Sequence, residues 1–202
     1  MNERSLEVHL EKIVPRWEWR TFGDRFGDAE GRFAALDQDG VQESGESYFL
    51  SPTGDQNVKV RDRLMDIKTL EQVNPDGLEQ WKPVMKGSFP LAAAEVETVF
   101  SALSVAPPPL ARSDYSLEQF VKELAQPGQR LGVVEVHKKR TRYKIDGCMS
   151  EMTEVIADGR RTRTVAIESE DPARVIATVR KLGLDGFENI NYPRGLKRLI
   201  GM

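Results

Sequence analysis

The chain has 202 residues, of which 39% are hydrophobic and 30% are charged. It can therefore build one substantial core, or at most two small ones, but a compact fold cannot place all of these charges on a solvated outer surface. The net charge is only −3, from 29 basic and 32 acidic residues, which argues against a general nucleic-acid-binding surface.

The few cysteines and histidines limit the chemistry further. Cys148 is the only cysteine, and His9 and His137 are the only histidines. A disulfide framework and a zinc site built from cysteines or histidines are thereby excluded. A divalent ion would be held largely by carboxylates, which favours Mg²⁺, Mn²⁺ or Ca²⁺.

The segment from Met1 to Lys12 is charged and lacks an apolar run, so no signal peptide is expected. No apolar stretch is long enough for a membrane helix. We therefore expect a cytoplasmic protein that contacts neither membrane nor nucleic acid and that is a monomer or a homodimer.

The first half of the chain is predicted to be mainly strands. Alternating apolar and polar residues predict strands over 16–22, 46–51, 57–62, 65–73 and 77–86, and a short helix over 26–36. Turn residues at 52–55 and 74–77 separate the strands. The segment from Gly40 to Gly45 is expected to be a linker that either gates a tunnel mouth or is mobile.

The second half is predicted to have a similar organisation. A helix is expected over 91–103, and the prolines at 107–109 then force an extended connection, so residues 105–113 are the candidate midpoint of a single domain spanning 1–202. Ser116 and Gln119 form a capping box for a second helix. Strands are predicted over 131–144, 148–156 and 161–169. Asp171 and Pro172 begin a further helix, and a short final helix follows Pro193.

These elements predict an α+β fold in which seven or eight antiparallel strands form a closed or nearly closed barrel with outer helices. A β-sandwich with outside helices is the alternative.

Charged residues fall on one face of several predicted strands. Since side chains two apart in a strand share a face, each of the following sets lies on one side of its strand: Arg16, Glu18 and Arg20; Lys59 and Arg61; Lys138, Arg140, Arg142 and Lys144; Glu168 and Glu170. The simplest interpretation is that these charged faces are the solvent-exposed outer faces of the strands. However, the opposite face of the first strand carries Trp17 and Trp19, which need a dry environment beneath outer helices. That placement leaves the charges inside.

Such an interior suits polyphosphate chemistry. Paired carboxylates can share a hard divalent ion, and Lys and Arg can neutralise phosphate oxygens. Phosphoryl transfer depends mostly on positioning and charge neutralisation. A Ser-His-Asp arrangement is not credible with these two histidines.

The strand motifs resemble those of the CYTH superfamily, the triphosphate tunnel metalloenzymes, which include class IV adenylate cyclases and thiamine triphosphatases. Lys59-Val-Arg61 resembles the family's Arg-x-Arg strand, and Asp66-Ile-Lys68 its lysine strand. Lys139-Arg140-Thr-Arg142 resembles the second basic strand. Segments 151–155 and 166–170 resemble its two acidic strands, and 191–196 its closing segment. The resemblance spans Trp17 to Leu199 and implies an eight-stranded tunnel with metal-dependent hydrolysis or cyclisation of triphosphates.

The first strand departs from the family pattern Glu-x-Glu-x-Lys. Arg16 stands where the first acid is expected, and Arg20 replaces the lysine. Thr153 likewise replaces an acid in the Glu-x-Asp strand. Replacing an acid with a base changes the local charge by two units, which weakens a metal site.

The leading hypothesis is a metal-dependent phosphohydrolase acting on inorganic triphosphate or an organic triphosphate. Glu168 and Glu170 are the candidate catalytic residues. The candidate phosphate ligands are Arg20, Lys59, Arg61, Lys68, Arg140 and Arg142, and the candidate ligands for Mg²⁺ or Mn²⁺ are Glu18, Glu151, Glu168 and Glu170. A non-catalytic module that binds polyphosphate or a nucleotide, and an adenylate cyclase, are the alternatives.

Overall fold

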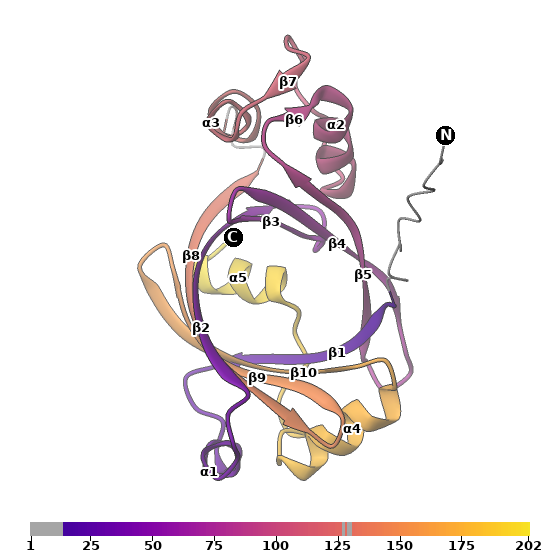
Figure 1. Cartoon of the computed structure of the whole chain (residues 1–202), viewed down its shortest axis with the longest axis vertical. Coiled ribbons are helices and arrows are strands. Elements are labelled where there is room, and N and C mark those ends of the chain that lie inside the picture. The colour runs from indigo at the N-terminus through magenta and orange to yellow at the C-terminus, as the bar shows by residue number, and fades with distance from the viewer. Residues whose placement is uncertain (1–13, 127, 129–130) are drawn as a thin grey trace, which may run out of the picture.

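The chain folds around a closed barrel of eight antiparallel strands (Figure 1). A computed structural model describes residues 14–126, 128 and 131–202. Around the barrel the strand order is β1-β10-β9-β8-β2-β3-β4-β5. The barrel strands are β1 (Arg16–Gly23), β2 (Gly40–Leu50), β3 (Asn57–Arg61), β4 (Leu64–Val73), β5 (Glu79–Ser88), β8 (Gly132–Ile145), β9 (Cys148–Ala157) and β10 (Arg160–Ser169). The predicted α+β fold with an eight-stranded barrel is confirmed, and it has the form that the CYTH resemblance implied.

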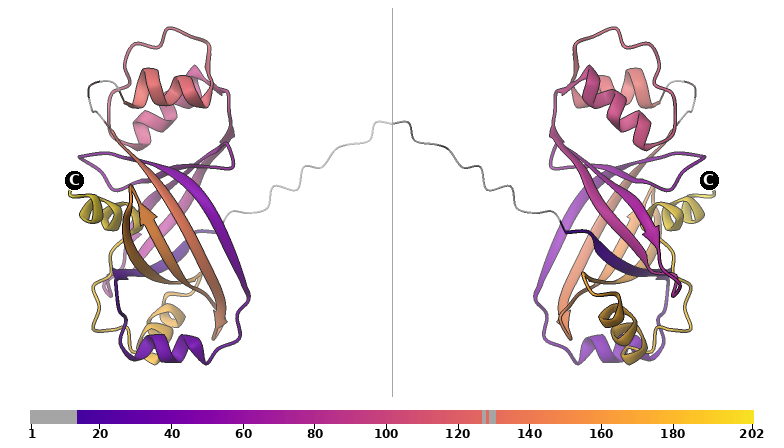
Figure 2. Two further views of the ribbon diagram at one scale, coloured as in Figure 1. Left: turned by 90° about the vertical axis from the view of Figure 1, so that its left-hand side faces the viewer. Right: turned by 90° about the vertical axis from the view of Figure 1, so that its right-hand side faces the viewer.

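The described helices surround the barrel, four of them on the outside of its wall and the last one across one end (Figure 1 and Figure 2). They are α1 (Asp28–Ala34), α2 (Ala93–Ala102), α3 (Leu117–Gln119), which continues as the π-helix η1 (Phe120–Ala125), α4 (Pro172–Lys181) and α5 (Tyr192–Ile200). A two-stranded sheet, β6 (Leu91–Ala92) with β7 (Asp114–Tyr115), lies beside α2 (Figure 1). Among the described residues, no helix has both the length and the apolar character needed to span a bilayer.

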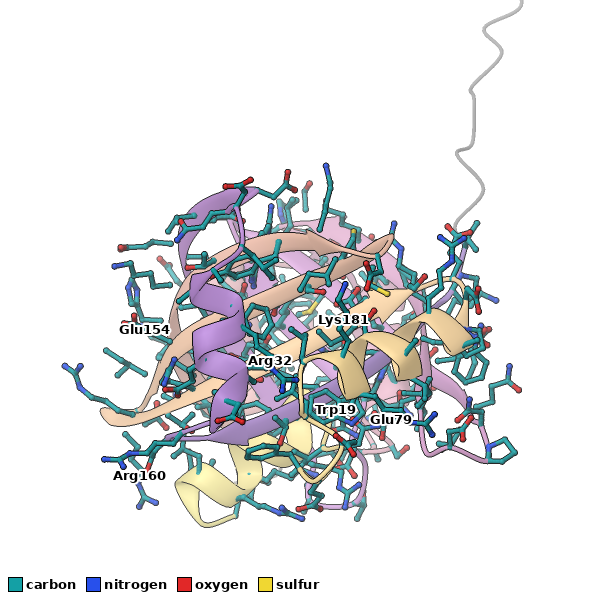
Figure 3. The ribbon with its side chains drawn as sticks, turned by 90° about the horizontal axis from the view of Figure 1, so that it is seen from below. Trp19, Arg32, Glu79, Glu154, Arg160 and Lys181 are labelled. Atoms are coloured by element: carbon teal, nitrogen blue, oxygen red, sulfur yellow. The ribbon has the colours of Figure 1, made fainter. Side chains whose placement is uncertain are left out.

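The outward faces of the strands form two apolar cores with these helices. Val58 and Val60 of β3 pack with Phe100 of α2 and Phe120 of η1. On the other side, Trp19 is buried in a cluster that contains residues of α1 and α4, and Figure 3 shows it near α4. The apolar residues of β1 and β3 therefore face outward, as the alternation predicted, and their charged residues face the barrel interior.

The interior itself is apolar at one end. There the inward-facing Leu50, Val136 and Val155 pack against Tyr192 and Leu196 of α5. In the view down the barrel, α5 lies across this end (Figure 1). The charged part of the interior therefore begins on the far side of this apolar cluster.

Local signals in the sequence set several helix starts. The Ser116 hydroxyl accepts a hydrogen bond from the Gln119 amide at 3.3 Å, and the Gln119 side chain accepts one from the Ser116 amide at 2.9 Å. Asp171 likewise caps α4 by accepting from the Ala173 amide at 2.9 Å. Both predicted caps are confirmed.

One predicted segment is wrong. Gly40 to Gly45 is not a linker but the first half of β2, which pairs with β8 from Gly40↔Arg142 to Leu50↔Gly132. The ladder hydrogen bonds of a long neighbouring strand outweigh the weak strand propensity of this Gly- and Ser-containing sequence.

Candidate functional site

The barrel encloses a cavity of about 480 Å³ whose lining is mainly charged. Nine basic and five acidic side chains face it, although the whole chain carries a net charge of −3. The bases are Arg16, Arg20, Lys59, Arg61, Lys68, Lys138, Arg140, Arg142 and Lys144; the acids are Glu18, Asp39, Asp66, Glu151 and Glu168.

The side chains that line the cavity become more exposed to solvent along β8, from Lys138 to Lys144. Lys138 is 2% exposed and Arg140 8%, whereas the Lys144 side chain is 75% exposed. The apolar cluster under α5 lies beyond the Lys138 end. The cavity therefore opens at the end away from α5, with Arg142 and Lys144 near its mouth.

Most of the predicted site residues meet in this cavity. Lys59, Arg61, Lys68, Arg140, Arg142 and Arg20 line it, as do Glu18, Glu151 and Glu168. Glu170 does not, because β10 ends at Ser169 and the Glu170 side chain is exposed just beyond the strand. The two-residue periodicity that paired Glu168 with Glu170 stops where the strand stops.

The three carboxylates on adjacent strands, Glu18 (β1), Glu168 (β10) and Glu151 (β9), form what we call the acidic group. Glu18 and Glu168 are direct partners in the β1–β10 register. Burial, reinforced by the Glu18 carboxylate, raises the pKa of Glu168 to about 7. Burial opposes ionisation of Glu18 as well, but Arg20 and Lys68 together hold its pKa below the ordinary value.

Arg20 lies within the acidic group and joins two of its members. Its Nε donates to Glu18 Oε1 at 2.7 Å, and its Nη1 donates to Glu151 Oε1 at 3.2 Å. Despite burial, these two carboxylates raise the pKa of Arg20 well above its ordinary value. Arg140 Nε lies 3.0 Å from the other oxygen of Glu151. Glu151 is thus paired with two arginines.

Arg16, the other departure in the first strand, has a different environment. It is exposed, and its Nη1 donates to Met149 Sδ at 3.4 Å. Its charge lies at the rim of the cavity and does not neutralise the buried acids directly.

Four bases on β3 and β8 surround one carboxylate that the sequence did not single out, Glu46 of β2. Glu46 Oε2 lies 3.1 Å from Lys59 Nζ and 2.8 Å from Lys138 Nζ. Glu46 Oε1 lies 3.6 Å from Arg61 and 3.7 Å from Arg140. We call these five residues the Glu46 cluster. Although burial favours its neutral form, Lys138 and Lys59 hold the pKa of Glu46 far below its ordinary value.

Two tyrosines close the inner side of this cluster. Tyr48 of β2 and Tyr192 of α5 stack with ring centroids 5.1 Å apart. Lys138 Nζ lies 3.8 Å from the Tyr192 centroid and donates to the Tyr48 hydroxyl at 2.6 Å. Burial and the neighbouring Lys59 lower the pKa of Lys138 well below its ordinary value, and the aromatic faces act against that shift by favouring the ammonium form.

Sequence reasoning missed Glu46, Tyr48 and Tyr192. Glu46 stands in a polar run, Glu43 to Ser47, in which no alternation marks the inward side. Glu46 and Tyr48 are two apart, and that spacing within one long β2 is the signal that could have placed both residues inside. Tyr192 arrives from α5, so no strand pattern could have found it.

A second hollow, about 460 Å³, lies on the outside of β8, β9 and β10. It is lined by charged residues of both signs, among them Glu43, His137, Lys139 and Glu154. His137 Nε2 lies 3.7 Å from Glu43, and Lys139 pairs in register with Glu154. Glu154 projects away from the barrel in Figure 3. His137 therefore lies on the outer surface, as predicted, opposite the face that carries Arg140.

The acidic group offers few free ligands to a divalent ion. Within the described ranges, no three His, Cys, Asp or Glu side chains are gathered closely enough to hold a metal ion. Glu18 and Glu168, two buried carboxylates in register, fit one hard ion that keeps several waters. Glu151 is already paired with two arginines and Glu18 with one of them, so the residues present fit at most one ion.

Comparison with known proteins gives a likeness of fold. No family model and no curated protein matches the sequence. Among solved structures, a conserved hypothetical protein from Pyrococcus furiosus is 16% identical with a TM-score of 0.48, covering 87% of this chain and 98% of that chain. A candidate adenylyl cyclase from Hippeastrum, described as having a dominant triphosphatase activity, is 13% identical with a TM-score of 0.47, covering 88% and 91%. A candidate adenylate cyclase from Bacillus halodurans is 9% identical with a TM-score of 0.48, covering 92% and 98%. At these identities and TM-scores, the likenesses say nothing about the chemistry of this chain's cavity.

Proposed function

We propose that the barrel binds a linear triphosphate, either free or as part of an organic molecule, and hydrolyses it with the help of one divalent cation. The observation that carries this proposal is the excess of bases in an enclosed cavity of a chain that is acidic overall. Three of these bases, Arg16, Arg142 and Lys144, are exposed near the mouth, but four deeper ones, Lys59, Arg61, Lys138 and Arg140, share the single carboxylate of Glu46. Buried cations need anionic partners, and one carboxylate cannot neutralise four of them.

Unpaired polar atoms support a ligand in the same place. The side-chain oxygens Asn57 Oδ1 and Tyr192 Oη are buried without a hydrogen-bond partner in the described part of the chain, and both residues line the cavity. Buried polar atoms without partners are uncommon unless water or a ligand satisfies them.

In this proposal the phosphate oxygens are held by Lys59, Arg61, Lys68, Arg140 and Arg142. Arginine matches phosphate geometry with paired donors, and lysine adds a point charge. Arg20 is engaged with Glu18 and Glu151. Its role is therefore to hold Glu18 and Glu151 of the acidic group in place, and we do not assign it a phosphate contact.

Glu18 and Glu168 would hold Mg²⁺ or Mn²⁺, with Glu151 beside them. When bound, such an ion neutralises phosphate charge and favours a water-derived nucleophile. A bound cation would favour the ionised form of Glu168 and so lower its pKa from the value of about 7 in the metal-free chain, and the Glu168 carboxylate would then accept a hydrogen bond from that water and orient it. Glu170 has no role in this arrangement, since it lies outside the cavity.

A second candidate function is polyphosphate binding without turnover. Arg20 already neutralises Glu18 and Glu151, and Arg16 adds positive charge at the rim. A base at position 16 in place of an acid weakens a cation site while leaving an anion site intact, whereas arginine in place of lysine at position 20 keeps the charge unchanged.

Phosphate release from tripolyphosphate, measured with Mg²⁺, with Mn²⁺ and with a chelator, separates the two candidates. Hydrolysis predicts release that requires the metal and is lost in Glu168→Gln. The matched control is Glu154→Gln, which removes the same charge from the outer face of the barrel and should behave as the unaltered protein. Tight binding without release under all three conditions would favour the binding module, and the absence of binding would reject both. ATP in place of tripolyphosphate, with cyclic AMP as the product sought, tests the cyclase alternative.

A further inference from the structure

Glu46 differs from every other acid around the cavity because it does not face the cavity itself. Its side chain is completely buried, with an exposed fraction of 0%, and it is absent from the lining. Its four basic neighbours, Lys59, Arg61, Lys138 and Arg140, do line the cavity. The bases therefore lie between Glu46 and the space that a ligand would occupy.

We propose that Glu46 is a positioning residue that holds these four bases in place and fixes the positive charge that a phosphate meets at the inner end of the cavity. The inference rests on the proposed phosphate site and assigns a role to a carboxylate that touches no ligand. Each of the two Glu46 oxygens faces one lysine or arginine from β3 and one from β8, so a single side chain fixes bases from both strands.

Buried lysines are the weak point of such a site. Lys138 is 2% exposed and the Lys59 side chain 12% exposed, and desolvation disfavours the charged form of both. Burial lowers the pKa of each lysine, and the Glu46 carboxylate acts against that shift. Without Glu46 the lysines would release their protons at lower pH, and the site would lose positive charge.

The other groups around this pair do not replace Glu46. Seven charged or titratable side chains surround it and Lys138: Tyr48 on β2, Lys59 and Arg61 on β3, Arg140 on β8, Glu151 on β9, Arg20 on β1 and Tyr192 on α5. Four of the seven are cations, which repel the Lys138 ammonium. Glu151 is held by Arg20 and Arg140, and burial raises the pKa of both tyrosines well above the ordinary value, so they stay neutral.

The test measures tripolyphosphate affinity by calorimetry from about pH 6 to about pH 10, the range in which lysines of lowered pKa lose their protons. Glu46→Gln is compared with the unaltered chain and with Glu43→Gln, which removes the same charge from the exposed outer side of β2. We expect the affinity of Glu46→Gln to decline at lower pH than that of the unaltered chain, with about a tenfold loss at the alkaline end for each unit by which the lysine pKa falls. Toward the acid end, where a lower pH favours the charged form of the lysines in both proteins, the loss should become smaller. Glu43→Gln should follow the unaltered chain throughout.

Glu46→Asp serves as the second variant. It keeps the charge but retracts the carboxylate by one methylene, so its decline should fall between those of the unaltered chain and Glu46→Gln. It also keeps the test open if Glu46→Gln does not fold. A role in stability alone would lower the melting temperature and leave the pH profile of binding unchanged, and that result would overturn the inference. If the unaltered chain binds no tripolyphosphate at any pH, the proposed function itself fails.

Discussion

Glu18 and Glu168 lie opposite each other on the paired strands β1 and β10. Among the described contacts, Glu18 accepts a hydrogen bond from a basic side chain, that of Arg20, and Glu168 does not. Burial and the neighbouring Glu18 carboxylate raise the pKa of Glu168 to about 7. As the pH rises, the unfolded chain, in which the pKa of Glu168 has its ordinary value of 4.5, therefore loses the Glu168 proton at a lower pH than the folded chain does.

This difference predicts a pH dependence of stability in the absence of metal. Between about pH 4.5 and about pH 7 the folded state binds more protons at Glu168 than the unfolded state, so the free energy of unfolding falls as the pH rises through this window. Glu168→Gln should remove this decline, which amounts to up to about 3 kcal/mol. Urea unfolding in a chelating buffer measures it. Glu170→Gln, two residues further along and exposed, should keep the decline, and a variant of Glu170 that abolished it would contradict the placement of the two residues.

Arg20→Gln should destabilise the fold strongly, because it leaves Glu18 and Glu151 buried without their shared cation. The expected cost is about 3 to 5 kcal/mol at neutral pH, measured by urea unfolding. Mn²⁺ should recover part of that loss by taking the place of the missing charge. Arg163→Gln is the control: its ion pair with Glu30 is partly exposed on the outside of the barrel, and its loss should cost less than about 1 kcal/mol. Equal costs for the two variants would argue against a special role for Arg20.

Arg61→Gln should weaken tripolyphosphate binding by about ten- to a hundredfold, the size of a charge-assisted hydrogen bond to a phosphate. Arg61 faces the cavity with a side chain that is 29% exposed. Its ion pairs with other described residues are long, 3.6 Å to Glu46 and 3.9 Å to Asp62, so its loss should disturb the fold little. Lys139→Gln removes a charge from the outer face of β8 and should bind like the unaltered chain. Calorimetry at one fixed salt concentration gives the comparison, since phosphate binding depends on salt.

Gly195→Ala should destabilise the chain and weaken tripolyphosphate binding together. A Cβ at Gly195 would overlap the ring of Phe22, so α5 would have to move from the end of the barrel, and Tyr192 would move with it. Overpacking of this kind costs about 1 to 3 kcal/mol. At Gly186 a Cβ would meet nothing within 4 Å, so Gly186→Ala should leave melting temperature and binding unchanged. Destabilisation without any change in affinity would show that the position of α5 does not matter to the cavity.

The sequence was sufficient for the barrel and for most of its lining because alternation is a local property. Lys59 with Arg61, and Lys138 with Arg140, are two apart in continuous strands, so their common face follows from strand geometry. The apolar Trp17 and Trp19 then indicated that the opposite, charged face of the first strand lies inside the barrel. The helix starts at Ser116 and Asp171 were predictable for the same reason, since a cap depends on the three residues that follow it.

What could not be predicted depends on contacts between distant strands. Glu170 shared the pattern of Glu168, but the strand ends before it. Glu46 belongs to the site because β2 lies between β3 and β8 in the barrel. This strand order brings the Glu46 carboxylate within hydrogen-bond distance of Lys138, which is 92 residues away in the sequence. The departure of Arg16 from the family pattern that the first strand resembles could be read in the sequence, but the placement of Arg20 between Glu18 and Glu151 depends on the closed barrel.

The arrangement of charge around the barrel has one further consequence. The acidic group lies on the adjacent strands β1, β10 and β9, and the Glu46 cluster lies on β8, β2 and β3. An electric field therefore runs across the cavity rather than along it. A polyanion on one side and a divalent cation on the other would attract each other through this narrow space. Linkage then requires each to raise the affinity of the other by the same factor.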